Sequence, residues 1–148
     1  MQVYRIAHPR FAQDLSGEGV RLYGGRWNAK GYACLYTAEH PALALLELAV
    51  HFTAQSLPDS MSLVVISFPD EFLTKADFIK LQNDTDIQDY SEELGTSWLK
   101  KRSSLVLKVP SIVCPKSFNY LINPAHISHR DVFIEEEISV IIDGRIKS

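Results

Sequence analysis

Residues 24–52 hold three consecutive features: the turn sequence Gly24-Gly25-Arg26-Trp27-Asn28, the segment Cys34-Leu35-Tyr36-Thr37-Ala38, and an apolar run, 42–50, that carries Glu47. The pattern predicts a glycine turn, a short strand and a helix in direct succession. A sequence that served stability alone would rarely place a lone arginine and a lone carboxylate in these positions. This stretch therefore bears on function as well as on fold.

Glu47 is the only charged residue in the run 42–50, which follows His40-Pro41. Proline suits the first turn of a helix, and the run is apolar nearly all round, so we expect a mostly buried helix. Ala44, Glu47 and His51 share one stripe of that helix. Burying an unpaired carboxylate is costly, so Glu47 should form an ion pair with an arginine, become protonated or line a cleft.

Arg26 directly follows the double glycine 24–25, and Trp27-Asn28 adds an aromatic surface and an amide. Taken alone, the glycines favour a tight turn over close approach of the backbone to a ligand. Because a guanidinium presents a planar fork of donors, Arg26 in this setting favours an anion clamp. The spacing matches neither the phosphate-binding loop nor the dinucleotide fingerprint.

Three further residues have both a structural and a functional explanation. Tyr36 lies in an apolar strand, where a tyrosine usually belongs to the core. Arg5, in the predicted strand 3–7, is equally well explained as a solvent-facing side chain. Ser111 follows Pro110 as a turn residue does, and without a Gly-x-Ser-x-Gly context it is better suited to hydrogen-bond a ligand than to act as a nucleophile.

The remaining chain predicts a single α+β domain, 1–148, with mostly antiparallel sheet and a few helices. The expected strands are 3–7, 20–23, 33–38, 63–68, 105–109, 118–122 and 132–143, the last followed by a turn at Asp143-Gly144. A second helix is expected over 91–101, with Leu94, Trp98 and Leu99 facing inward. The acidic segment 69–93 is expected to hold a short helix and loops at the edge of the fold.

The composition excludes several classes of function. A formal charge of −3 gives no general attraction to nucleic acid or to anionic lipid. The histidines and cysteines lack metal-ligand spacing, and Cys34 and Cys114 are expected to be reduced core residues. The chain shows no secretory signal and no apolar run long enough to cross a bilayer, so we expect a cytoplasmic protein without bound metal.

Taken together, the motifs resemble those of the RES-domain family, which is named for its arginine, glutamate and serine. The resemblance extends from Tyr4-Arg5 to Asn123-Pro124-x-His126 and so spans most of the chain. Between these ends it is carried by Gly24-Gly25-Arg26-Trp27-Asn28, Leu35-Tyr36-Thr37-Ala38, Leu46-Glu47 and Val109-Pro110-Ser111.

The resemblance implies the toxin of a bacterial type II toxin–antitoxin pair, with a fold like that of ADP-ribosyltransferase toxins. It implies cleavage of NAD+ at the nicotinamide–ribose bond, by hydrolysis or phosphorolysis, with NAD+ as a substrate and no resident cofactor. It also implies a cognate Xre-like helix-turn-helix antitoxin, with room for a homodimer in that complex. The residues that it assigns to catalysis are Arg26, Tyr36, Glu47 and Ser111, and those that it assigns to NAD+ binding are Arg5, Gly25, Arg26, Trp27 and Asn123.

Two alternatives stay open at this point. The chain could transfer ADP-ribose to a cytoplasmic protein, or it could be a module that binds a nucleotide or a protein without chemistry. The acceptor of the ADP-ribose is not specified by the sequence.

Overall fold

The computed structural model describes residues 1–74, 77–78 and 84–147. Its strands are β1 (Gln2–Ala7), β2 (Leu35–Ala38), β3 (Ser60–Ser67), β4 (Asp77–Phe78), β5 (Val106–Pro110), β6 (Phe118–Ile122) and β7 (Phe133–Ile141). Its α-helices are α1 (Glu18–Tyr23), α2 (Pro41–Ala49), α3 (Glu71–Thr74) and α4 (Asp84–Lys101). The 3₁₀ helices are η1 (Pro9–Phe11), η2 (Ile127–Asp131) and η3 (Gly144–Lys147).

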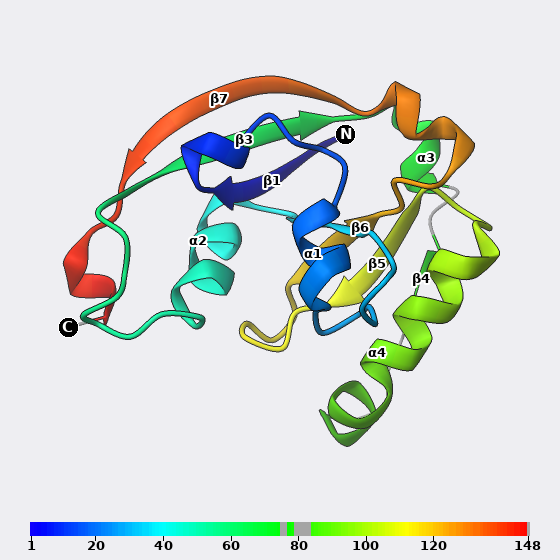
Figure 1. Ribbon diagram of the computed structural model, residues 1–148, viewed down its shortest axis with the longest axis horizontal. Helices are drawn as coiled ribbons and strands as arrows, with labels where there is room; N and C mark the ends of the chain where they lie inside the picture. Colours follow the sequence, from blue (N-terminus) through cyan, green and yellow to red (C-terminus); the bar gives the residue numbers. More distant parts are fainter. Residues whose placement is uncertain (75–76, 79–83, 148) are drawn as a thin grey trace.

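The described strands form one sheet in the order β4-β5-β6-β2-β1-β3-β7, which is antiparallel except between β4 and β5 (Figure 1). In the centre of this sheet, β1 and β2 share the single residue pair Tyr4–Ala38. By contrast, β1 pairs with β3 along six positions and β2 pairs with β6 along four. The sheet therefore opens between β1 and β2 into two halves.

Helix α2 packs over the point where the two halves meet. Its residues Leu43 and Ala44 form a small apolar cluster with Ala38 of β2, against which Tyr4 and Ile6 of β1 also pack. Pro41 begins the helix, and the side chain of His40 caps it by accepting a hydrogen bond from the Ala42 amide. Beyond this anchored first turn, the next turn of α2 extends along the opening in the sheet.

Two larger apolar clusters hold the sheet together from its opposite faces. One includes Val3, Leu35, Val64, Ile66, Val106 and Ile122. The other joins Leu107, Val109 and Leu121 of β5 and β6 to Trp98 and Leu99 of α4 and to Trp27. The alternation of side chains along each strand produces both faces.

Most of the predicted strands and the predicted α+β class are confirmed, but two local predictions are wrong. Residues 20–23 belong to helix α1, not to a strand. Leu94 is 37% exposed, so it does not face inward beside Trp98. Gly144, expected in a hairpin-like or terminal turn after the last strand, begins the 3₁₀ helix η3 that follows β7. The expectation for 69–93 lies partly outside the described residues.

Both cysteines are free, as predicted, although only Cys34 is fully buried and Cys114 lies half-buried in the loop between β5 and β6. No helix in the described ranges has the length and apolar character needed to span a bilayer. Those same ranges contain no cluster of three or more metal-binding side chains.

Candidate active site

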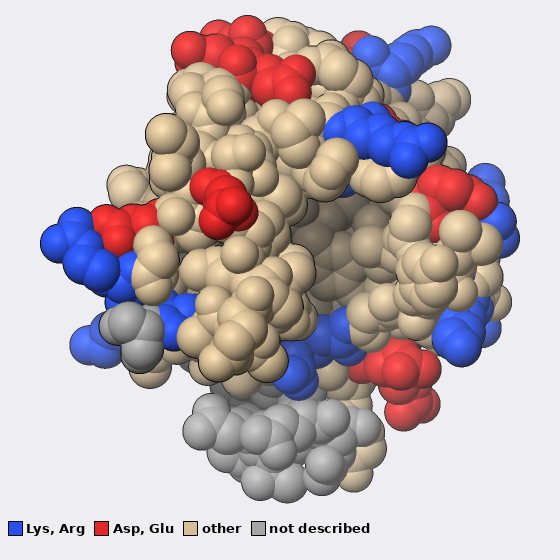
Figure 2. Space-filling model, turned by 60° about the vertical axis from the view of Figure 1, so that its left-hand side comes forward, with Lys and Arg blue, Asp and Glu red and all other residues tan. Residues whose placement is uncertain are grey.

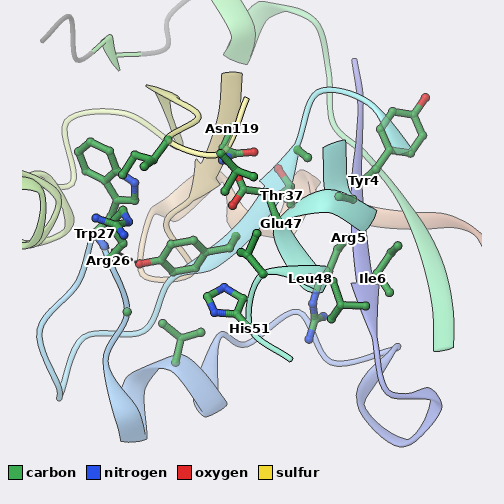
Figure 3. Close-up of a pocket in the computed structure, with 18 of the residues that line it drawn as sticks. Tyr4, Arg5, Ile6, Arg26, Trp27, Thr37, Glu47, Leu48, His51 and Asn119 are labelled. Carbon is green, nitrogen blue, oxygen red and sulfur yellow. Dashed lines mark hydrogen bonds between the residues drawn. The ribbon is translucent and has the colours of Figure 1, made fainter. Parts of the chain in front are cut away.

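A cavity of about 420 Å³ occupies the opening between β1 and β2 (Figure 3). Tyr4, Arg5 and Ile6 of β1 line one wall, and Tyr36 and Thr37 belong to the strand opposite. The turn after α1, the second half of α2 and the loop after β5 complete the lining. Figure 2 shows a deep hollow near the middle of one face of the molecule, with basic side chains on opposite sides of its opening.

Arg26 enters the cavity from a tight turn. The Gly25 amide donates to the Asn28 carbonyl at 3.0 Å, which leaves Arg26 and Trp27 at the two central positions. The Arg26 side chain is exposed and forms no hydrogen bond or ion pair with any described residue. Its guanidinium fork is therefore available to a ligand.

The hydroxyl of Tyr36 holds this turn in place through two hydrogen bonds. It accepts a hydrogen bond from the Trp27 amide at 2.9 Å and donates one to Asn28 Oδ1 at 2.6 Å. Burial raises the pKa of the Tyr36 hydroxyl, so it stays protonated and keeps donating at any physiological pH. The Tyr36 hydroxyl thus supports the backbone that carries Arg26.

Gly25 has no room for a side chain. A Cβ atom built at this position would lie 2.8 Å from both the Tyr36 hydroxyl oxygen and Asn28 Oδ1. The two hydrogen-bonding atoms that hold the turn therefore occupy the space that any larger residue would need. Glycine at position 25 lets the backbone of the turn pack closely against Tyr36 and Asn28. This packing within the turn explains the glycine without a ligand.

Glu47 lies one turn after Ala44 on α2 and lines the cavity. Its Oε1 atom accepts two hydrogen bonds, from Ser111 Oγ at 2.7 Å and from Asn119 Nδ2 at 2.8 Å. Within the described part of the chain, no arginine or lysine nitrogen lies within 4.0 Å of the carboxylate. The ion-pair explanation of Glu47 is therefore wrong, and the carboxylate lines a cleft.

Ser111 reaches Glu47 from the loop after β5. Its amide donates to the Ser117 carbonyl at 2.8 Å, and its Oγ atom accepts from the Cys114 amide at 3.1 Å. Because that amide occupies an acceptor site of the hydroxyl, the hydroxyl proton is directed to Glu47. Ser111 is thus a fixed neutral donor to the carboxylate.

Arg5 lines the cavity from β1 and is partly tied down. Its Nη1 atom donates to the Asp14 carbonyl oxygen at 2.8 Å. Burial lowers the pKa of Arg5, but an arginine retains its charge across the physiological range. Arg5 is thus a cation within the cavity, not a solvent-facing side chain.

The structure brings together all but one of the predicted site residues. Six of them line the cavity, namely Arg5, Gly25, Arg26, Trp27, Tyr36 and Glu47. Ser111 joins them through Glu47. Trp27 contributes little open surface, because it is only 3% exposed and packs into the core.

Asn123 is the exception, because it does not line the cavity. It is 1% exposed; its Nδ2 atom donates to the Leu99 carbonyl at 3.1 Å, and its Oδ1 atom accepts from the Ala125 amide at 3.0 Å. The expected contact with NAD+ does not fit this position. Asn123 instead joins the end of β6 to α4.

Asn119 and His51 line the cavity but were not assigned to the site from the sequence. Asn119 of β6 holds Glu47, and His51 lines the cavity one helical turn after Glu47. His51 could have been found, because it shares the stripe of Glu47. Asn119 gave a weaker signal, because one polar residue in a short strand is common at a solvent-facing position.

Comparison with known proteins identifies the family of this chain. The family model described as RES domain matches residues 2–143. The chain belongs to the RES-domain family. "Toxin Res" of Yersinia enterocolitica serotype O:8 is 35% identical over 152 residues, which cover 99% of this chain and 100% of that protein.

Two other similar proteins extend the comparison. The "Prs ADP-ribosylating toxin" of Sphingobium sp. (strain YBL2) is 40% identical over 121 residues, or 78% of this chain and 75% of that protein. A solved structure, the M. tuberculosis MbcT-MbcA toxin-antitoxin complex, contains a chain with a TM-score of 0.71 at 18% identity, covering 99% of this chain and 86% of that one. The RES-domain protein described here thus shares the fold of a solved toxin–antitoxin component.

Proposed function

We propose that this RES-domain protein cleaves NAD+ at the bond between nicotinamide and ribose. NAD+ would be consumed as a substrate, without a resident cofactor. The observation that carries the proposal is a carboxylate, Glu47, that lines a cavity with cationic walls and is held by two neutral donors without a cationic partner.

The cavity has a volume typical of small-molecule sites, and its charges suit the pyrophosphate of a dinucleotide. Its volume of about 420 Å³ lies within the range of roughly 300–1,000 Å³ that is typical of small-molecule sites. A pyrophosphate is doubly anionic, and the free fork of Arg26 is suited to bind its oxygens in pairs. Arg5 adds a second positive charge in the same cavity.

Glu47 supplies what cleavage of the N-glycosidic bond needs. As the bond from C1′ to the nicotinamide nitrogen breaks, nicotinamide leaves as a neutral molecule with the bonding electron pair, and positive charge develops on the ribose. A nearby carboxylate stabilises that charge electrostatically. An acceptor oxygen then bonds to C1′ and releases its proton.

The two neutral donors fit this task better than an arginine would. Ser111 and Asn119 hold the Glu47 carboxylate by hydrogen bonds without placing a positive charge beside it. Both converge on Oε1, so Oε2 is left for a ribose hydroxyl. Ser111 therefore contributes to the reaction by positioning Glu47. Tyr36 contributes by positioning the turn that carries Arg26.

Transfer of ADP-ribose to a protein is the second candidate. It is favoured by the 40% identity to a relative named as an ADP-ribosylating toxin. The bond cleaved would be the same, and only the acceptor would differ. With NAD+ labelled in the adenylate, label in free ADP-ribose, in its phosphate ester or on protein would identify water, phosphate or a protein as the acceptor.

The family also suggests a partner. We propose that a cognate antitoxin, of the Xre-like helix-turn-helix kind, binds this chain in the cytoplasm and that a homodimer forms within the complex. The existence of a protein partner is supported by the similar fold of a chain in the MbcT-MbcA toxin-antitoxin complex.

The activity is tested by incubating purified protein with NAD+ and measuring free nicotinamide. We expect release by the wild type and a loss of at least about 100-fold in Glu47→Gln, which is nearly isosteric but uncharged. Glu136→Gln is the matched control, because Glu136 is exposed on β7 and does not line the cavity. Full turnover by folded Glu47→Gln would remove Glu47 from the mechanism, and tight binding without turnover by the wild type would favour a non-catalytic module.

A further inference from the structure

Asn119 holds Glu47 with only one end of its side-chain amide. It lies on β6 opposite Ala38 of β2 and Val109 of β5, and it lines the cavity near Glu47 (Figure 3). Its Nδ2 atom donates to Glu47 Oε1 at 2.8 Å. An ionised carboxylate only accepts hydrogen bonds, so this contact requires the NH₂ group of the amide to face Glu47. The orientation of the amide is thereby fixed, and its oxygen faces elsewhere.

That oxygen, Asn119 Oδ1, is buried and accepts no hydrogen bond from any described residue. Buried polar atoms in folded proteins nearly always have a partner, because an unsatisfied one loses its hydration without compensation. An orphaned acceptor beside the proposed catalytic carboxylate is therefore a feature that calls for a donor. Ser111, the other residue that holds Glu47, cannot donate to Oδ1, because its hydroxyl proton is directed to the carboxylate.

We infer that Asn119 determines substrate specificity by accepting, through Oδ1, a hydrogen bond from a neutral N–H or O–H donor on the nicotinamide riboside half of the substrate. This inference rests on the proposed function. Two groups of NAD+ have the required chemistry: the carboxamide NH₂ of nicotinamide and the 3′-hydroxyl of its ribose. A nicotinic acid ring carries a carboxylate in place of the carboxamide and offers no donor there.

Because Oδ1 is buried in this structure, the contact requires the Asn119 amide to turn toward the cavity. The terminal torsion of an asparagine is broad, which leaves such a rotation open to the side chain. Ser111 continues to hold Oε1 meanwhile. A substrate that lacks the donor leaves Oδ1 unpaired, and sites that hydrogen-bond a substrate group reject such analogues strongly.

The test compares three substrates with three proteins. The substrates are NAD+, nicotinic acid adenine dinucleotide and an NAD+ analogue without the 3′-hydroxyl on the nicotinamide ribose. The proteins are the wild type, Asn119→Ala and Ser111→Ala, and kcat/KM for release of the base is measured for each pair. Ser111→Ala is the matched control, because it removes the other donor to Glu47 and leaves Oδ1 in place.

We expect the wild type to prefer NAD+ over at least one analogue by about tenfold or more. Ser111→Ala should turn over every substrate more slowly and keep that preference. Asn119→Ala should lose the preference for one analogue, and that analogue identifies the donor as the carboxamide or the 3′-hydroxyl. If Asn119→Ala does not fold, Asn119→Leu, similar in shape and suited to a strand, replaces it.

Outcomes against this inference differ from those against the proposed function. Turnover of NAD+ with equal preferences in Asn119→Ala and Ser111→Ala would overturn the role of Asn119 and leave NAD+ cleavage intact. If NAD+ binds without turnover, dissociation constants are measured by calorimetry in place of kcat/KM. The preference for NAD+ over each analogue is then compared among the three proteins in the same way, and it decides whether Asn119 sets the specificity. Failure to bind NAD+ at all would overturn both.

Discussion

Tyr36 and Gly25 show how single residues of this site depend on one another. The Tyr36 hydroxyl holds the turn of Arg26 through two hydrogen bonds, and Gly25 leaves it the space to do so. Neither requirement can be seen from one residue alone. The double glycine predicted a tight turn or close approach to a ligand, and the structure shows a turn that is fixed by a tyrosine.

This dependence predicts non-additive substitutions. Gly25→Ala should destabilise the fold by about 1–3 kcal/mol, because its Cβ meets the Tyr36 hydroxyl, and Tyr36→Phe should cost about 1 kcal/mol through lost hydrogen bonds. The double variant should lose less than the sum, because Phe removes one of the two clashing oxygens. Urea unfolding of the four proteins measures the coupling, and strict additivity would contradict it.

The residues that the sequence identified have in common an unusual local setting. Glu47 stood out because an apolar helix seldom carries a carboxylate, and Arg26 because it follows two glycines. Asn119 and Asn123, both in or next to β6, offered no such contrast. Which of the two faces the cavity depends on strand pairing and on the end of β6, so the sequence pointed to Asn123 and the structure to Asn119.

Among the helices and strands, α1 is the element whose local sequence pattern predicted the wrong secondary structure. Val20 to Tyr23 alternates as a strand does, which is why a strand was predicted. The segment is instead helical from Glu18, whose carboxylate accepts from Arg21 Nε at 2.7 Å, and Gly24 with a φ of 74° ends it. Six residues are too few for periodicity to distinguish the two structures, so the signals at the ends of the segment decide.

Two helical glycines predict opposite effects of the same substitution. Gly19 in α1 has open space around its missing Cβ, so Gly19→Ala should stabilise the fold by about 0.5–1 kcal/mol. Gly95 in α4 allows close packing: a Cβ there would lie 1.8 Å from the Trp27 carbonyl oxygen. Gly95→Ala should therefore destabilise by about 1–3 kcal/mol or more. Melting temperatures of both variants test this, and a neutral Gly95→Ala would contradict the contact between α4 and the Arg26 turn.

For the molecule as a whole, burial predicts a loss of stability in alkali. Burial raises the pKa of the Cys34 thiol and of the Tyr36 hydroxyl. Above about pH 8.5 the unfolded chain releases the Cys34 proton while the folded chain keeps it. The unfolded state then binds fewer protons, so the free energy of unfolding falls as pH rises.

The contribution of Cys34 should reach about 2 kcal/mol between pH 8 and pH 10. Urea unfolding at both pH values measures it. Cys34→Ala should reduce the fall by about that amount, and Cys114→Ala is the matched control that should retain it. An equal fall in the wild type and in Cys34→Ala would assign the alkaline loss to other groups.

For the whole molecule, the sequence predicted the class of the fold but not the separation of β1 from β2 in the sheet. Individual strands such as 3–7 and 33–38 were found from their composition, and their single shared pair, Tyr4–Ala38, lies beyond any local pattern. The position of the site depends on that pair. Residues far apart in the chain reach one cavity because the sheet separates there.

The gap between β1 and β2 also has a mechanical meaning. Each half of the sheet keeps its own hydrogen-bond ladder, so the chain tolerates a wedge at its centre without losing its framework. A dinucleotide bound there would contact β1 on one side and β2 on the other, and it would link the two halves of the sheet. The protein without a ligand and the protein with one would then differ chiefly in how stiffly the two halves of the sheet are joined.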